Sequence, residues 1–259
     1  MLLRALPEDI GSRTYVEPFV GAGALFLALR PSVARLSDAN SHLIACYEAI
    51  RLQPDLIYEY LCAHRARNSQ EYYYAVRSIY NRSGSSSAQA ARFIYLNKTC
   101  FNGIFRVNRQ GAFNVPYGHK DPPHLPTRGE LRQLSRLLRP ASLDARDFEE
   151  VLSETGRNDF VYLDPPYPPI NGTSFFTHYT TDRFSEVDQH RLADAVHALA
   201  GRGAKFMMSN ADTTLIRELY AAFRIVPLTV TRYITCKAVK HRADEVVITN
   251  YPVRPTDNA

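Results

Sequence analysis

The chain has 259 residues, of which 45% are hydrophobic and 22% are charged. This composition is typical of a globular protein with one large domain, or one domain carrying an insertion, and it excludes disordered, fibrous and disulfide-built classes. The formal charge of +5 favours a polyanionic partner such as nucleic acid, although coding composition alone can produce the same excess of arginine.

The four cysteines lie far apart, with no CxxC pair and no histidine at the spacing of a zinc site. We therefore expect a reduced cytoplasmic protein that holds no metal. The first residues are apolar only as far as Pro7 and Glu8, which is too short for a signal sequence or a membrane span. We expect neither export nor membrane anchoring.

The N-terminal residues predict a strand, a glycine turn, a helix and a second strand. These elements cover residues 14–20, 21–23, 24–29 and 34–37. Asp38 ends the second strand, and Asn40 or Ser41 is placed to cap the helix that follows.

The middle of the chain has a different pattern. Apolar residues recur at helical spacing from residue 42 to 100, with interruptions at Pro54 and at the SGSSS stretch of residues 83–87. Residues 101–117 then alternate around Gly111, as in a β-hairpin, with basic and aromatic residues interleaved. A helix is expected over residues 127–138.

Strands and helices alternate again in the remaining chain. Strands are expected at 142–147, 160–163, 204–208, 225–231 and 246–251, and helices at 185–200 and 213–223. Such α/β elements at both ends, separated by about a hundred residues of helices and a hairpin, predict a doubly wound sheet that carries an inserted module. We expect the insertion to determine specificity.

Asp164, Pro165, Pro166 and Tyr167 follow directly after the apolar strand ending in VYL. Open α/β folds bind their ligands at this carboxyl end of a strand. The two prolines restrict φ and remove two N–H donors, so the turn presents carbonyl oxygens and the Asp164 carboxylate as acceptors. A turn that merely ends the strand is the alternative interpretation.

These acceptors suit the exocyclic amino group of adenine, whose lone pair is delocalised into the ring. Asp164 and the Pro165 carbonyl can hold its two hydrogens and direct the lone pair at the methyl group of a sulfonium donor, which needs no metal. Tyr167 can stack on the base, a contact worth about 1–3 kcal/mol. The base must first leave the duplex.

A second pattern, EPFVGAG, lies at the first strand-to-helix turn. Gly21 and Gly23 allow a ligand to approach the backbone closely, with Glu17 and Phe19 beside them. Asp38 stands where an acidic side chain binds the ribose hydroxyls of a nucleoside cofactor.

Asp147 and Phe148 follow a third predicted strand. They can supply an acceptor for the amino group of the cofactor's adenine and an apolar face for its ring. A plain helix N-cap at Asp147 is an equally good interpretation.

With these motifs in this order, the chain resembles the Dam-type (D12 class) adenine-specific DNA methyltransferases, from about Tyr15 to Tyr251. The resemblance includes, besides EPFVGAG and DPPY, the stretches LSDANSHLI, NKTCFNGIFRVNRQGAFNVPYG, FTHYTTDRFS, MMSNADT and ADEVVITNY. It implies a Rossmann-like methyltransferase fold that uses S-adenosylmethionine. The catalytic domain would comprise residues 1–45 and 140–259, and the target-recognition module residues 46–139.

The resemblance also implies roles for individual residues. Asp38 and Asp147 would contact the cofactor, and Asp164 to Tyr167 would hold the target adenine. Eight residues of the inserted module would bind double-stranded DNA: Lys98, Phe101, Asn102, Arg106, Arg109, Asn114, Pro116 and His119. Phe101 and Asn102 would enter or brace the duplex, Arg106 would read a base edge, and Lys98, Arg109 and His119 would meet phosphates.

Two alternatives stay open. The same acceptors could serve the N4 amino group of cytosine. Family members usually open with a K-W-x-G-G-K stretch that has no counterpart here, so the chain could also be a DNA-binding relative with impaired catalysis. The resemblance is compatible with a GATC site, with nucleoid association and with a cognate restriction endonuclease, and it leaves the oligomeric state open.

Overall fold

The computed structural model describes residues 2–84, 86–168, 184–234 and 239–253. They form two compact units. The sheet unit comprises Met1–Ala39 and Pro140–Ala259, and the helical unit comprises Asn40–Arg139. The boundary expected at residue 45 falls inside a continuous helix, α2 (Ser41–Leu52), so the structure divides the chain before that helix instead. The function of each unit remains a prediction.

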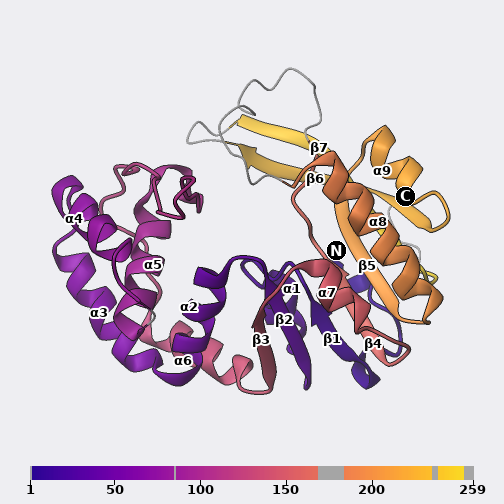
Figure 1. Ribbon diagram of the computed structural model, residues 1–259, viewed down its shortest axis with the longest axis horizontal. Helices are drawn as coiled ribbons and strands as arrows, with labels where there is room; N and C mark the ends of the chain where they lie inside the picture. Colours follow the sequence, from indigo (N-terminus) through magenta and orange to yellow (C-terminus); the bar gives the residue numbers. More distant parts are fainter. Residues whose placement is uncertain (1, 85, 169–183, 235–238, 254–259) are drawn as a thin grey trace. The chain divides into compact units, whose positions relative to one another are not determined.

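The sheet unit contains a seven-stranded sheet with the order β3-β2-β1-β4-β5-β7-β6 (Figure 1). Strands β1 to β5 pair in parallel, whereas β7 pairs antiparallel with β5 and with β6. The strand bounds are Thr14–Glu17 (β1), Ala34–Asp38 (β2), Ala141–Ala145 (β3), Asp159–Leu163 (β4), Lys205–Ala211 (β5), Arg224–Ile234 (β6) and Val239–Thr249 (β7). The connections reverse between β1 and β4, which is where doubly wound folds bind ligands.

Differences from the expected strand lengths have physical causes. β1 ends at Glu17 because Pro18 has no N–H for a ladder, and Val20 N donates instead to Ser37 O at 2.9 Å. β6 and β7 are longer than expected because they pair with each other over their whole length. Such long-range pairing has no local signal in either strand.

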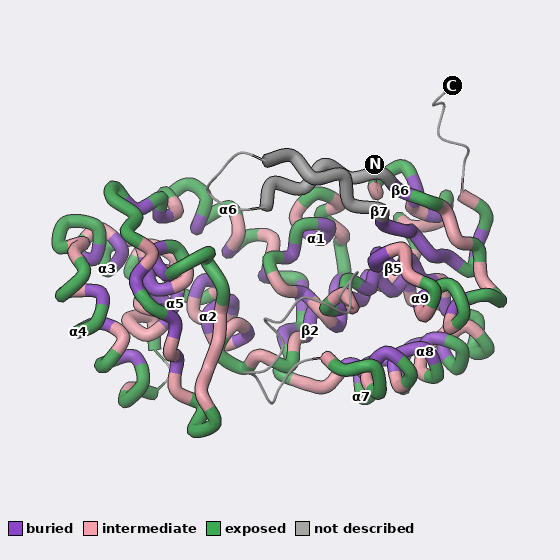
Figure 2. Tube along the Cα trace, turned by 90° about the horizontal axis from the view of Figure 1, so that it is seen from above, coloured by how far each residue is buried: buried purple, intermediate pink, exposed green. Residues whose placement is uncertain are grey.

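Helices cover both faces of this sheet. On one face, α7 (Phe148–Ser153), α8 (Glu186–Gly201) and α9 (Thr214–Leu219) pack on strand residues that include Val16. On the other face, Phe26 of α1 (Ala24–Leu29) contacts Tyr15. Because side chains alternate along a strand, Glu17 shares the face of Tyr15. Figure 2 shows β5 almost wholly buried, with buried and exposed positions alternating along α8.

The helical unit is built around α5. This helix packs against α2, α3 and α4, while α6 packs against α2 and α3. The remaining bounds are Pro54–Ala66 (α3), Gln70–Tyr80 (α4), Ser87–Thr99 (α5) and Arg128–Leu138 (α6). Asn40 caps α2, and Thr127 forms a capping box with Glu130 at the start of α6.

Residues 100–119 of the helical unit double back on themselves, as expected, but they pair only through isolated bridges. These antiparallel bridges join Cys100 to Tyr117 and Val107 to Phe113. The side chains of α4 and its C-cap take the place of a ladder: Asn81 donates to Phe113 O at 3.0 Å and accepts from Phe113 N at 2.9 Å. Bonds to helix side chains therefore shape this segment.

Candidate active site

The turn after β1 brings the glycine motif to Asp38. Gly21 and Gly23 have φ of 45° and 63°, in the left-handed region that favours glycine. This conformation directs Gly21 N to Asp38 Oδ2 at 3.0 Å. The hydrogen bond fixes the carboxylate at the end of β2 beside the exposed turn.

A cavity of about 800 Å³ opens beside this turn, on the side of α7 and α8. Acidic and aromatic side chains line it together with residues Asp164 to Tyr167, which we call the proline corner. Its lining is Pro18, Phe19, Gly21, Asp38, Ala39, Asp147, Phe148, Asp164, Pro165, Pro166, Tyr167, Phe184 and Asp188. The structure thus brings together all four predicted catalytic residues and six of the eight predicted cofactor residues.

The other two predicted cofactor residues, Glu17 and Gly23, line a second cavity of about 710 Å³. It lies on the α1 side of the sheet and includes Tyr162, Ser209 and Glu245 in its lining. Phe19, Gly21, Asp164 and Tyr167 belong to both cavities. The proline corner therefore stands between two adjacent spaces, each large enough for part of a ligand.

Asp164 is held in place from β5. Ser209 Oγ donates to Asp164 Oδ1 at 2.9 Å. Ser209 Oγ also lies 2.9 Å from the Tyr162 hydroxyl oxygen. Because Ser209 has one hydroxyl proton, which it gives to the carboxylate, Tyr162 must donate to Ser209. Leu163 of β4 pairs with Met208 of β5 in parallel register. Asp164 and Ser209 each follow directly after these partners, so they are also neighbours.

Hydrogen bonds also hold Pro166 and Tyr167 of the proline corner. Gln189 of α8, buried at 1% exposure, donates to the Pro166 carbonyl at 3.0 Å. The Tyr167 hydroxyl donates to Glu245 of β7 at 3.5 Å. Burial, and then the charge of Asp164, raises the pKa of both Tyr162 and Tyr167, so both hydroxyls are neutral donors.

Glu17 is a buried acid, with 2% exposure. It accepts a hydrogen bond from the Tyr15 hydroxyl at 2.8 Å. Burial raises its pKa to about 8; the Tyr15 bond opposes this rise and the charge of Asp164 adds to it. Near neutral pH the Glu17 carboxyl is therefore mostly protonated.

Asp147 is the N-cap of α7 and also lines the first cavity, whereas its role toward a cofactor stays a prediction. Its Oδ1 accepts from Glu149 N at 3.0 Å, which makes it the N-cap of α7, and its side chain also lines the first cavity. Phe148 beside it stacks with Phe19, with ring centroids 5.3 Å apart. A cap and a site residue are thus compatible.

The eight predicted DNA-binding residues all lie in the helical unit, on α5 or in residues 101–119. Six are exposed: Lys98, Phe101, Asn102, Arg109, Pro116 and His119. The other two, Arg106 and Asn114, are half-buried and bonded to each other, with Arg106 Nε donating to Asn114 Oδ1 at 2.9 Å. Gly118 has no room for a side chain, because a Cβ there would lie 2.5 Å from Cys100 O.

Sequence reasoning assigned no role to Tyr162, Gln189, Arg191, Ser209 or Glu245. Ser209 and Glu245 lie within the MMSNADT and ADEVVITNY stretches, so the resemblance already marked those positions. Their contacts with the proline corner depend on strand order, which a local pattern does not contain.

In the described part of the chain, no helix has the length and apolarity needed to cross a membrane. Within the same residues, no group of three or more histidine, cysteine, aspartate or glutamate side chains could hold a metal ion.

Comparison with known proteins identifies the family of this chain. The chain is 39% identical over 245 residues to the type II methyltransferase M1.LlaDCHI of Lactococcus lactis subsp. cremoris, covering 92% of this chain and 86% of that protein. It is 38% identical over 266 residues to the type II methyltransferase M.MjaIII of Methanocaldococcus jannaschii, covering 95% and 92%. A DNA adenine methylase of Escherichia coli K12 is 34% identical over 238 residues, covering 90% and 84%. The sequence profile of one family matches residues 1–234, and the chain belongs to that family, the D12 class N6 adenine-specific DNA methyltransferases.

Proposed function

We propose that this chain transfers a methyl group from S-adenosylmethionine to N6 of an adenine in a short duplex DNA site, after the base has left the helix. The observation that carries the proposal is the position of Asp164. Its carboxylate lines both cavities and is held by Ser209 at 2.9 Å. A carboxylate fixed between two ligand spaces can act on one ligand in the presence of the other.

The first cavity fits a nucleoside cofactor in its size and its donor and acceptor set. Its volume of about 800 Å³ lies within the range of small-molecule sites. Asp38 is suited to the ribose hydroxyls, Asp147 to an adenine amino group, and Phe148 and Phe19 to the ring. When bound, S-adenosylmethionine supplies a methyl group on a sulfonium, an electrophile that needs no metal.

The residues of the proline corner then activate the target. Asp164 and the Pro165 carbonyl accept the two N6 hydrogens, which returns electron density to N6 and directs its lone pair away from the acceptors. As N6 forms the new bond to the methyl carbon, the bond from that carbon to the donor's sulfur breaks and its electron pair stays on the sulfur. The proton that N6 loses leaves along its hydrogen bond to Asp164 and passes on to solvent. Tyr167 stacks on the extruded base, which offsets part of the cost of unstacking.

The helical unit supplies DNA binding in this proposal. In it, the basic side chains at 98, 109 and 119 meet phosphates and Arg106 reads a base edge. The exposure of the first three supports this assignment. A duplex containing GATC is the first site to test. The type II names of two relatives support a search for a cognate restriction endonuclease, and action on chromosomal DNA supports a cytoplasmic location.

One assay tests the proposal against its alternatives. The purified chain is incubated with methyl-labelled S-adenosylmethionine and unmethylated duplex DNA, and the DNA is digested to nucleosides. We expect the label in N6-methyldeoxyadenosine. Label in N4-methyldeoxycytidine would establish cytosine chemistry instead, and intact DNA binding without label would establish a relative that transfers no methyl group.

A further inference from the structure

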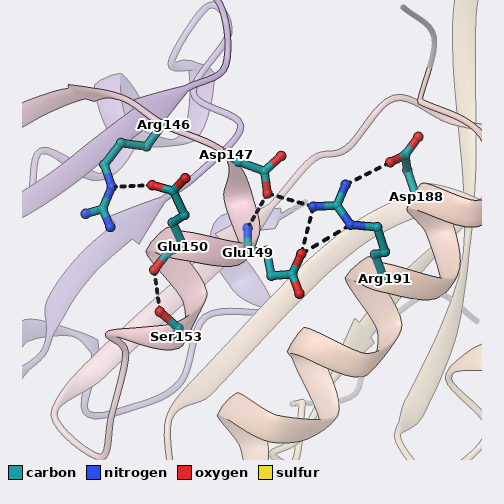
Figure 3. Close-up of polar contacts among 7 residues, drawn as sticks. All are labelled: Arg146, Asp147, Glu149, Glu150, Ser153, Asp188 and Arg191. Atoms are coloured by element: carbon teal, nitrogen blue, oxygen red, sulfur yellow. Dashed lines mark hydrogen bonds and ion pairs between the residues drawn. The ribbon is translucent and has the colours of Figure 1, made fainter.

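Arg191 of α8 lies beside the corner between β3 and α7, outside the lining of the first cavity (Figure 3). All three of its guanidinium nitrogens bind carboxylates. Nη2 bonds Asp147 Oδ1 at 3.1 Å and Glu149 Oε2 at 2.7 Å, and Nε bonds the same Glu149 oxygen at 3.1 Å. Nη1 bonds Asp188 Oδ1 at 2.9 Å.

The guanidinium also covers an aromatic ring. Its central carbon lies 5.0 Å from the centroid of Phe148, in the geometry of a cation–π contact. Arg191 therefore contacts both residues that we assign to the cofactor's base, Asp147 and Phe148. Only a planar fork with several N–H groups can make these contacts together, and a lysine ammonium cannot.

The hydrogen bond from Arg191 to Asp147 is not needed to cap α7. The cap needs only the bond from Glu149 N to Asp147 Oδ1. Arg191 places a second donor on that same oxygen, so two donors from different elements restrict rotation of the carboxylate. The direction of Asp147 Oδ2 is thereby fixed relative to the Phe148 ring.

We propose that Arg191 is a positioning residue that orients Asp147 and Phe148, so that the first cavity selects a 6-amino purine over a 6-oxo purine. An amino group donates to the fixed carboxylate, whereas the oxygen of hypoxanthine would oppose it with a second acceptor. This inference rests on the proposed function, because it assumes that the cofactor's base binds at Asp147.

Binding of two stable nucleosides tests the inference without methyl transfer. S-adenosylhomocysteine and S-inosylhomocysteine differ only in the purine, which has an amino group at position 6 in the first and an oxygen at position 6 with a hydrogen on N1 in the second. Their dissociation constants can be measured by calorimetry. We expect the wild-type chain to prefer the adenine compound by about tenfold or more, as for a hydrogen bond to a charged group. Arg191→Met should reduce that preference to about threefold or less.

The chain offers a matched control in Arg146, which lies just before α7 and pairs with carboxylates of that helix and its C-cap. Arg146 pairs with Glu150 at 3.2 Å and with Glu154 at 2.7 Å, but it makes no bond to Asp147 in Figure 3. Arg146→Met removes a similar charge and similar ion pairs from α7, and it should leave the preference unchanged. Arg191→Lys keeps the charge and should still lose most of the preference.

The outcomes separate this inference from the proposed function. If the wild-type chain binds neither compound, the proposed function fails. If the wild-type chain prefers the adenine compound and both Arg191 variants keep the same preference, only the role of Arg191 is overturned. Equal weakening of both compounds, together with a lowered melting temperature, would make Arg191 a purely structural residue and would also overturn the inference.

Discussion

The proline corner of the sheet unit and residues 100–119 of the helical unit are held in place in different ways. At the corner, parallel strands β4 and β5 set the backbone, and buried side chains such as Ser209 fix the acceptor atoms. In residues 100–119 the backbone has two isolated bridges, and α4 side chains bind it directly. Tyr73 Oη and Arg77 Nη1 both donate to Val115 O, at 2.9 and 3.0 Å.

This difference indicates what each region must preserve. In the proposed mechanism, chemistry at Asp164 requires acceptors placed to within a fraction of an ångström, and a ladder with buried bonds provides that. Recognition requires side chains that can change without unfolding the protein. A segment tied to helices by a few side chains, with its tips exposed, allows that change.

The largest expected effect is at the corner. Asp164→Ala should reduce methyl transfer by at least about a hundredfold, because N6 loses an acceptor in the transition state. Duplex affinity and the free energy of unfolding should change little, because Asp164 is exposed and lies in a turn. Single-turnover transfer, filter binding and denaturant unfolding measure the three quantities.

Asp164→Asn sharpens this test, because the amide keeps one acceptor oxygen and should retain more activity than alanine. Near-full activity of Asp164→Ala would refute the role of the corner as an acceptor site.

The second prediction concerns residues 100–119. Arg106→Ala should weaken binding to the preferred duplex by roughly 1–3 kcal/mol and relax the sequence preference at one base pair. Cofactor affinity should not change. Binding to a panel of single-substitution duplexes measures the preference.

Arg109→Ala is the matched control for Arg106→Ala. It should weaken binding to all duplexes equally and lower the salt dependence by about one phosphate contact. If Arg106→Ala behaves in the same way, Arg106 contacts a phosphate rather than a base.

A smaller effect is expected from the bond behind the corner. Ser209→Ala should lower kcat about tenfold without raising the KM for cofactor, because Asp164 loses the donor that fixes Oδ1. Ser209→Thr keeps the hydroxyl and should restore part of the rate. A change in KM alone would show that Ser209 serves binding rather than the position of Asp164.

The last prediction concerns the pH dependence of stability rather than catalysis or DNA binding. The folded chain retains the Glu17 proton up to about pH 8, whereas the unfolded chain releases it near 4.5, so unfolding becomes easier as the pH rises between these values. The Gln side chain of Glu17→Gln does not titrate. The free energy of unfolding of the variant, relative to that of the wild type, should therefore rise with pH in this window by at most about 1.4 kcal/mol per pH unit. A difference that stays constant with pH in urea titrations would contradict this expectation.

Local elements could be predicted closely from the sequence. α1 occupies residues 24–29 as expected, Asp38 ends β2, and α6 begins after Thr127. These features depend on neighbouring residues: glycine turns, capping side chains and the period of apolar positions. The acidic residues at strand ends could be identified for the same reason, because the end of a parallel strand is visible locally.

Tertiary structure alone decided which side chains meet there. Ser209 and Asp164 lie 45 residues apart, and Arg191 and Asp147 lie 44 apart. They touch because β5 pairs with β4 in one register and because α8 packs beside α7. Sheet order and helix packing arise from burial of apolar surface over the whole unit, which no short stretch of sequence encodes.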